Sequence, residues 1–431
     1  MALQAGLVLV VVFLLMLVIS VPISISIVIA SLVTILTILP MDMAIFTAAQ
    51  KIVTGLDSFT LLAVPFFILS GILMNNGGIA ERLINFAKVL VGKMPGSLAH
   101  ANILGNMLFG SLSGSSVAAA AAIGRTMGPL QKKEGYDPKF SAAVNIASAP
   151  TGLIIPPSGI LIIYSLVSGG TSVAALFIAG YLPGILWGLA CMLVGFIIAK
   201  RKKYPVSERV SFSVAFKTFL DAIPSLMLIV IVIGGILGGI FTATEAAAVA
   251  VAYTFILAMA YRTVNMSDMP KIIMETVEIT SVIMLLVAAS SVMSWVMAFT
   301  GIPTALSQLI MGISDNAIII LLILNVLLLF VGTIMDITPA VLIFTPIFLP
   351  IVTSFGMDPL HFGIMMILNL SIGNITPPVG SALFVGASIA NLDIEDVIKP
   401  LVPFYVSIIF VLLLVTYIPE ISMILPRLFG Y

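Results

Sequence analysis

Two short polar stretches interrupt apolar segments of the chain, and their side chains are of the kind that bind a hard cation. Residues 110–116 read Gly-Ser-Leu-Ser-Gly-Ser-Ser, and residues 332–339 read Gly-Thr-Ile-Met-Asp-Ile-Thr-Pro. Hydroxyl, carbonyl and carboxylate oxygens suit an ion such as Na⁺. Close packing of small residues is the alternative explanation for the serine-rich stretch. It does not explain Asp336, because a lone carboxylate deep in an apolar segment is costly and usually functional.

Two proline pairs, Pro156-Pro157 and Pro377-Pro378, fall in the middle of other apolar segments. Proline removes a backbone donor and stops a helix. In a membrane, each carbonyl that this frees needs protein, water or an ion as its partner. An isolated proline would favour a simple kink. Because the breaks at 149–157 and 373–378 occupy equivalent places in the two halves of the chain, we expect each to be an unwound stretch that binds an ion or a substrate.

Two further charged residues in apolar surroundings each have two explanations. Glu245 follows Phe-Thr-Ala-Thr at the joint of two spans, where it is either a helix N-terminal charge or a functional group. Arg125 either attracts an anionic substrate or extends to the membrane surface beside Lys132.

No other pattern indicates chemistry at a covalent bond. The sequence has no Gly-Lys-Ser/Thr phosphate loop, nucleophile–base pair, metal cluster or basic nucleic-acid patch. We therefore expect a protein that is not an enzyme, carries no cofactor and does not use ATP directly.

Composition shows which elements must position these groups. Of 431 residues, 61% are hydrophobic and 8% are charged, whereas soluble domains have about 25% charged residues. A multi-pass protein of the bacterial inner membrane is therefore expected. The apolar segments that we expect to span the membrane are 5–20, 22–39, 59–76, 138–168, 173–199, 219–240, 242–261, 281–299, 317–331, 360–390 and 403–424.

Basic residues predict the orientation. The run at 200–203 is Lys-Arg-Lys-Lys and should lie in the cytoplasm. Lys88 and Lys132 flank the interrupted segment 97–128 on both sides, which predicts a re-entrant hairpin that enters from the cytoplasm. No Lys or Arg occurs between Lys271 and Lys399. The second hairpin, 304–353, should therefore enter from the periplasm.

The two halves of the chain repeat each other. Gly-x-Asp-Pro at 135–138 and x-Pro-Pro-x-Gly at 155–159 recur at 356–359 and 376–380, an offset of 221 residues in both cases. We expect repeats at 1–210 and 211–431, each with an amphipathic arm helix (41–57 and 265–279), a hairpin and a broken helix (138–168 and 360–390). Inverted repeats of this kind are typical of secondary transporters, although duplication for packing alone would also produce them.

Taken together, these motifs resemble the large membrane subunit of tripartite ATP-independent periplasmic (TRAP) transporters over essentially the full chain. The matching stretches are 110–116, 154–158, 241–247, 336–339 and 374–380. The sequence as a whole is most similar to the sialic-acid (N-acetylneuraminate) branch of this family. The resemblance implies an all-α polytopic fold with an inverted repeat, two re-entrant hairpins and two broken helices, working as an elevator. It also implies Na⁺ coupling, a separate small four-helix membrane subunit and a soluble periplasmic binding protein.

The resemblance also implies specific site residues. One Na⁺ site would be lined by Ser113, Gly114, Ser115 and Gly152. Its symmetry mate would be lined by Gly332, Thr333, Asp336, Gly373 and Thr376. The organic-acid substrate is expected at Ser116, Pro156, Thr338, Pro377 and Arg125. Because the first tip has Gly114 where the second has Asp336, the two ion sites cannot be chemically equal.

Three functions therefore remain open at the level of sequence. The first is a Na⁺-driven elevator carrier for an organic acid within a three-part system. The second is a stand-alone Na⁺- or H⁺-coupled dicarboxylate or anion carrier of the same architecture. The third, a membrane enzyme or a scaffold without transport, is disfavoured because no catalytic constellation is present.

Overall fold

The protein is helical throughout its described regular structure. The computed structural model describes residues 2–92, 94–206, 211–312, 314 and 316–431. Among these residues, eight helices are long and apolar enough to cross a membrane, or nine if one bent pair counts as a span. Large apolar side chains such as Leu322 and Phe330 are exposed, by 46% and 63%. Lipid makes such exposure stable, so the architecture is that of the multi-pass membrane protein that composition predicts.

The first half of the chain supplies the elements up to α11. They are α1 (Ala2–Val18), α2 (Ile23–Leu36), α3 (Met41–Leu56), the 3₁₀ helix η1 (Phe59–Leu62), α4 (Ala63–Asn76), α5 (Ile79–Val91), α6 (Ser97–Ser113), α7 (Ser116–Lys133), α8 (Pro138–Ser148), α9 (Thr151–Ile154), α10 (Gly159–Val167) and α11 (Val173–Lys202).

The second half supplies the remaining helices. They are α12 (Phe212–Leu237), α13 (Ala243–Ala260), α14 (Met269–Thr300), α15 (Ile302–Met311), α16 (Ala317–Ile334), α17 (Ile337–Ser354), α18 (Pro359–Gly373), α19 (Ser381–Ile389), α20 (Ile394–Tyr417) and α21 (Glu420–Leu428). The predicted repeat boundary falls at residues 207–210, outside the described residues.

Both interrupted segments are helical hairpins with tight tips. In the first, α6 ends at Ser113, Gly114 adopts the left-handed conformation with φ 62°, and α7 starts at Ser116. In the second, α16 and α17 are separated by Met335 and Asp336, both extended. The second hairpin is shorter than the segment 304–353, because α15 is a separate helix that precedes it.

The repeated Gly-x-Asp-Pro motif stops one helix and starts the next in each half. Gly135 and Gly356 have φ of 79° and 80°, a conformation that glycine adopts without strain. Asp137 and Asp358 are N-caps whose carboxylates accept the N–H of the second following residue, at 3.0 and 2.7 Å. The proline after each aspartate occupies the first helical turn, where its missing N–H costs nothing.

The broken helices are interrupted at the proline pairs. In the first half, α8 and the short α9 are followed by an extended stretch at 155–158, and α10 continues at an angle of 48°. In the second half, non-helical residues 374–380 separate α18 from α19. The Pro-Pro peptide bond is cis in both. The sequence prediction of an unwound stretch at each proline pair is therefore confirmed.

Two predicted boundaries differ from the structure. The second arm, 265–279, is the first third of the continuous helix α14, since no glycine or proline interrupts the chain between Lys271 and Thr300. The last predicted span, 403–424, is instead α20, which starts at Ile394 and contains Pro400 and Pro403. Prolines are tolerated inside membrane helices because neighbouring groups satisfy the freed carbonyls.

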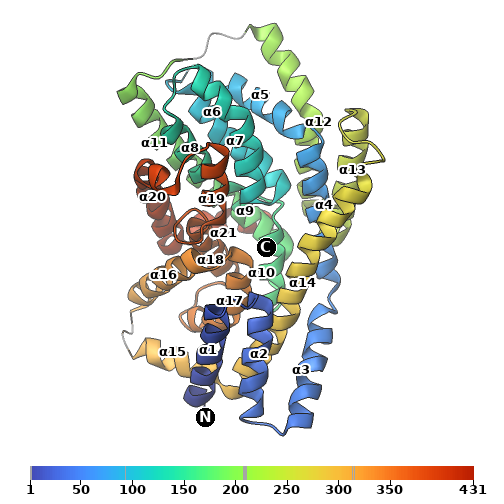
Figure 1. Ribbon diagram of the computed structural model, residues 1–431, viewed down its shortest axis with the longest axis vertical. Coiled ribbons are helices and arrows are strands. Elements are labelled where there is room, and N and C mark those ends of the chain that lie inside the picture. The colour runs from blue at the N-terminus through green and yellow to red at the C-terminus, as the bar shows by residue number, and fades with distance from the viewer. Residues whose placement is uncertain (1, 93, 207–210, 313, 315) are drawn as a thin grey trace.

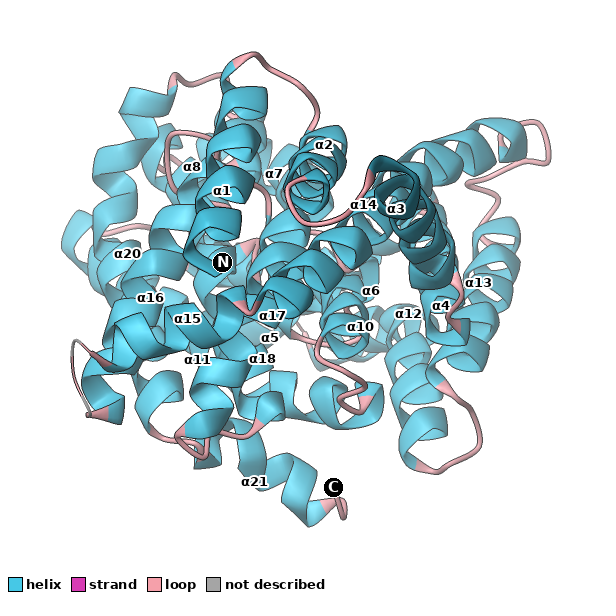
Figure 2. Ribbon diagram, turned by 90° about the horizontal axis from the view of Figure 1, so that it is seen from below, coloured by secondary structure: helices cyan, strands magenta, loops and turns pink. Residues whose placement is uncertain are grey.

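The helices divide into two sides. In both views, α3, α4, α12, α13 and α14 lie together along one side of the molecule, away from α16, α18 and α20 (Figures 1 and 2). The repeat is visible in the packing: α4 packs along α13, and α14 packs along α2. Arm helix α3 packs on α14, and α14 packs on α4, where Ile272 shares an apolar cluster with Ile68 and Leu73. Each half thus packs its helices against those of the other half in the same way.

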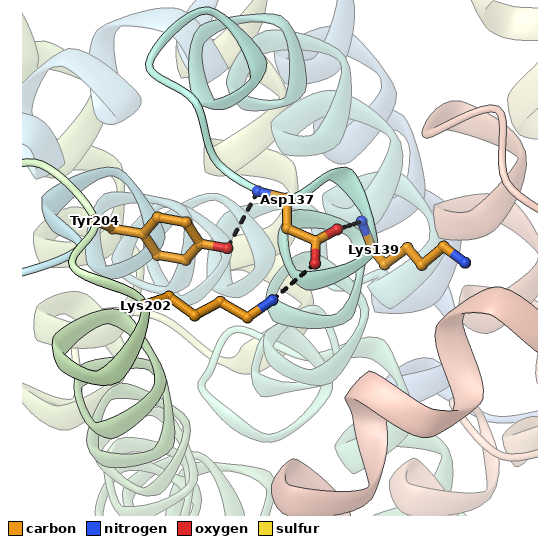
Figure 3. A network of polar contacts seen from close by, with 4 residues as sticks. All are labelled: Asp137, Lys139, Lys202 and Tyr204. Atoms are coloured by element: carbon orange, nitrogen blue, oxygen red, sulfur yellow. Dashed lines mark hydrogen bonds and ion pairs between the residues drawn. The ribbon is translucent and has the colours of Figure 1, made fainter.

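Charged residues tie together one end of the hairpin side. Lys202 Nζ donates to Asp137 Oδ2 at 2.8 Å, and the N–H of Asp137 donates to Tyr204 Oη at 3.1 Å (Figure 3). Lys139 forms an ion pair with Asp396 of α20. These contacts join the ends of α8, α11 and α20 at the lysine-rich face that the sequence analysis assigns to the cytoplasm.

Candidate functional site

Paired glycines let each hairpin cross its broken helix at backbone contact. A Cβ atom at Gly152 would lie 2.3 Å from Gly110 Cα, and one at Gly373 would lie 2.3 Å from the carbonyl carbon of Gly332. No side chain fits between these backbones. The crossings therefore fix where each hairpin tip meets its unwound stretch.

One cavity of about 540 Å³ brings the two tips together. It contains six of the predicted site residues: Ser113, Gly114, Ser115, Ser116, Asp336 and Thr338. Its opposite wall belongs to α4 and α14 and includes Ile68, Asn75, Glu275 and Ile283. The cavity thus lies between the hairpin side of the molecule and the side formed by α4 and α14.

Four helices begin at this cavity. The first turns of α7, α10, α17 and α19 all contribute lining residues, among them Ser116, Gly159, Ile337 and Ser381. Helix N-termini carry partial positive charge and free N–H groups, so they attract anions. Four of them around one cavity suit a carboxylate.

Asp336 lines the cavity without capping the helix that follows it. It is the N-cap residue of α17 by position, but its side chain makes no capping hydrogen bond. Its Oδ1 accepts a long hydrogen bond from Ser381 Oγ, at 3.4 Å. By contrast, Ser115 at the first tip does cap its helix, since its Oγ accepts the Ala118 N–H at 3.2 Å.

Asn374 and Ser381 line the cavity although the sequence analysis did not select them as site residues. Asn374 Nδ2 donates to Ser116 Oγ at 2.8 Å, and its Oδ1 accepts from Ser381 Oγ at 2.5 Å and from the Ala382 N–H at 3.1 Å. Asn374 therefore links the broken helix of one half to the hairpin tip of the other. The sequence repeat could have indicated Asn374, because the residue 221 positions before it is the apolar Leu153. A polar residue at only one of two equivalent positions suggests a role beyond the shared fold.

Several predicted site residues lie beside the cavity and do not line it. Gly152, Gly332 and Gly373 form the helix crossings. Thr333 Oγ1 donates to the carbonyl of Phe330, and Thr376 Oγ1 donates to that of Ile372, both at 2.7 Å. Pro156 and Pro377 belong to the two breaks in the helices.

Arg125 and Glu245 are outside this cavity. Arg125 is exposed on α7, nine residues or about 13 Å beyond Ser116. The structure thus favours extension to the surface over substrate contact. Glu245 completes a capping box at the start of α13, where its Oε2 accepts the Thr242 N–H at 2.8 Å and Thr242 Oγ1 accepts the Glu245 N–H. The helix N-terminal explanation of Glu245 is therefore the one that the structure supports.

The chain matches known proteins over most of its length. The family model described as "Tripartite ATP-independent periplasmic transporter, DctM component" matches residues 10–421. YgiK of Salmonella typhimurium is 56% identical over 93% of this chain and 92% of its own. The sialic acid TRAP transporter large permease protein SiaM of Vibrio cholerae is 41% identical, covering 89% and 90%. The C4-dicarboxylate TRAP transporter large permease protein DctM of Pseudomonas aeruginosa is 39% identical, again covering 89% and 90%.

The fold also has a solved counterpart. The YdaH transporter of Alcanivorax borkumensis superposes with a TM-score of 0.60 over 91% of this chain and 90% of its own, at 16% sequence identity. That likeness concerns the fold alone. The relatives are permeases of the bacterial inner membrane and not enzymes. The match over residues 10–421, with relatives up to 56% identical, shows that the chain belongs to the DctM family, the large permeases of tripartite ATP-independent periplasmic transporters.

Proposed function

We propose that this permease imports an organic acid with Na⁺ as the coupling ion, and that N-acetylneuraminate is the first substrate to test. The observation that carries the proposal is the cavity where four helix N-termini converge beside the carboxylate of Asp336. The N-termini suit the acid group of the substrate. The oxygens of Ser113, Ser115 and Asp336 suit Na⁺. The sialic-acid relative at 41% identity supports the choice of substrate, and the C4-dicarboxylate relative at 39% provides the competing one.

We further propose that transport works as an elevator. The cavity has one wall from the hairpins and broken helices and another from α4 and α14. Ion pairs hold the hairpin side together at its lysine-rich face, as Lys139–Asp396 and Lys202–Asp137 do. In the proposal, the hairpin side moves as a unit against α4 and α14 and takes the bound ligands across the membrane.

Two partners complete the proposed system. A periplasmic binding protein delivers the substrate, and a small four-helix membrane subunit associates with the permease. Both follow from the family to which the chain belongs. The second candidate function is a stand-alone anion carrier of the same architecture, which would need neither partner.

Uptake in proteoliposomes tests the proposal. The purified permease and its small subunit are reconstituted, and labelled N-acetylneuraminate uptake is measured with and without an inward Na⁺ gradient and the binding protein. We expect uptake only when both the gradient and the binding protein are present. Equal uptake without the binding protein supports the stand-alone carrier, and equal uptake with K⁺ in place of Na⁺ excludes sodium coupling.

A further inference from the structure

The cavity between the tips contains a carboxylate that the proposed ion and anion sites do not use. Glu275 lines the cavity from α14, opposite the hairpin tips, and Asn75 lines it from the end of α4. The Glu275 side chain forms no hydrogen bond or ion pair with any described residue, and its residue is exposed. Its carboxylate is therefore free to face whatever occupies the cavity.

The course of the chain shows which membrane face this wall is near. α11 ends in the basic run that the positive-inside rule assigns to the cytoplasm. α12 and α13 are each long enough to cross the membrane, so α14 begins again on the cytoplasmic side. Glu275 lies in the second turn of α14. It is therefore nearer the cytoplasmic side than Ile279 and Ile283, the other residues of α14 that line the cavity.

The charges of the lining residues are one-sided. Asp336 and Glu275 are both acidic, and none of the described residues that line this cavity is Lys or Arg. The four helix N-termini suit one carboxylate. A second carboxylate on the same substrate would extend toward Glu275 and find no cationic side chain there. Hydroxyl or amide N–H groups in that position would instead find acceptors in Glu275 and in the carbonyl oxygen of the Asn75 amide.

We infer that Glu275 is a specificity residue that selects acids with one carboxylate and a neutral, hydroxyl-bearing remainder over dicarboxylates. Like charges repel each other, so Glu275 penalises the second carboxylate of a C4-dicarboxylate. The inference rests on the proposed function and extends it, because it assigns selectivity to the permease as well as to a binding protein. It concerns a wall that does not belong to the hairpins or broken helices.

Glu275→Gln tests this inference, and Glu278→Gln is its matched control. Both residues are exposed on α14 three positions apart, but Glu278 does not line the cavity. Ligand-dependent thermal stabilisation of the purified permease with its small subunit, in Na⁺, measures affinity without a binding protein. The two ligands are N-acetylneuraminate and succinate.

We expect the wild type and Glu278→Gln to bind N-acetylneuraminate at least tenfold more tightly than succinate. We expect Glu275→Gln to reduce that ratio about tenfold, mainly through tighter binding of succinate. A ratio unchanged by Glu275→Gln, or a wild type that does not discriminate, overturns the inference and leaves the proposed function standing. A wild type stabilised by neither anion in Na⁺ overturns the proposed function and the inference with it.

Discussion

The two hairpin regions have the same backbone design but different side chains at the shared cavity. Both have a glycine crossing, an Asp-Pro helix start and a proline pair that breaks a helix. The second half is the more polar where the two meet. The equivalent pairs, first half then second, are Gly114 and Asp336, Leu153 and Asn374, and Ile160 and Ser381.

The comparison separates what the fold requires from what binding requires. The backbone crossings require glycine in both halves, because a Cβ atom at Gly152 or Gly373 would collide with the facing backbone. Side chains that face the cavity are free to diverge. The first tip keeps hydroxyls, such as Ser113 and Ser115, and the second provides a carboxylate and an amide. If both tips hold ions, the site beside Asp336 should bind the more tightly.

The largest expected effect comes from the shared backbone, where the two halves should respond alike. Gly152→Ala and Gly373→Ala each place a Cβ atom 2.3 Å from a backbone atom of the facing hairpin. Overpacking that forces the backbone to shift costs about 1–3 kcal/mol, and occasionally more. We expect a sharp loss of folded protein for both variants, measured as the yield of monodisperse permease and its melting temperature.

Gly234→Ala is the control for this pair. Gly234 is exposed inside α12, and a Cβ atom there would meet nothing within 4 Å. This variant should be as stable as the wild type or slightly more so, because alanine favours the helix. If only one of the two crossing variants loses stability, the backbones of the two halves are not equivalent.

The next effect should differ between the halves. Asp336→Asn removes the only carboxylate contributed by either hairpin tip, and we expect the Na⁺ concentration for half-maximal uptake to rise about 100-fold. Ser113→Ala removes a neutral oxygen from the first tip and should raise the Na⁺ concentration for half-maximal uptake by about tenfold. Uptake by reconstituted permease over a range of Na⁺ concentrations measures both. Equal effects of the two variants would contradict the assigned inequality of the tips.

Exchanging equivalent residues between the halves sharpens the comparison further. Asn374→Leu introduces the side chain found at position 153 and removes the amide that bonds the Ser116 and Ser381 hydroxyls, whereas the Ala382 N–H keeps the backbone carbonyl of residue 374. Unpaired buried polar groups cost about 1–3 kcal/mol. We expect a lower melting temperature and reduced uptake.

Asn76→Leu is the control for the exchange, because Asn76 is exposed and makes a single hydrogen bond to the carbonyl of Ile72. The Asn76→Leu variant should have nearly the same melting temperature and uptake as the wild type. A stable, fully active Asn374→Leu variant would show that the link between the two halves has no role.

The smallest effect concerns the two aspartate caps. Burial raises the pKa of Asp137, but hydrogen bonds from Lys202 and from the Lys139 N–H outweigh it and lower the pKa below its ordinary value. Asn is as good a cap as Asp, so Asp137→Asn removes the ion pair and keeps the cap. Because Lys202 and Asp137 are both substantially exposed, we expect a loss of at most about 1 kcal/mol at pH 7.

The pH dependence of this loss has a definite sign. A carboxyl whose pKa is lowered by folding stabilises the protein above its unfolded pKa, which is about 3.9 for Asp. The stabilisation is lost as the pH falls through the folded value. Wild type and Asp137→Asn should therefore differ in melting temperature at pH 6–8 and converge below about pH 4. The Asp358 carboxylate forms no ion pair with a described residue. The melting temperature of Asp358→Asn should therefore match that of the wild type in both pH ranges.

Much of the candidate site could be predicted because its signals are local in sequence. Gly-x-Asp-Pro and Pro-Pro specify helix ends by their own chemistry, and both hairpin tips lie where polar residues interrupt apolar segments. Glu245 was undecided because a carboxylate at a helix N-terminus has the same sequence signature whether it caps the helix, as Glu245 does, or leaves it uncapped, as Asp336 does. Arg125 was undecided because the sequence does not show which face of α7 packs inside the protein.

The sequence by itself determined that the chain lies in a membrane, that its halves repeat, and where each helix breaks. These depend on hydropathy, spacing and the backbone limits of glycine and proline, which act within a few residues. Only the tertiary structure decided that Asn374 joins the two halves, that four helix N-termini meet at one cavity, and that Glu275 faces the tips across it. Such contacts join residues up to 258 positions apart, and distance along the chain carries no information about them until the helices pack.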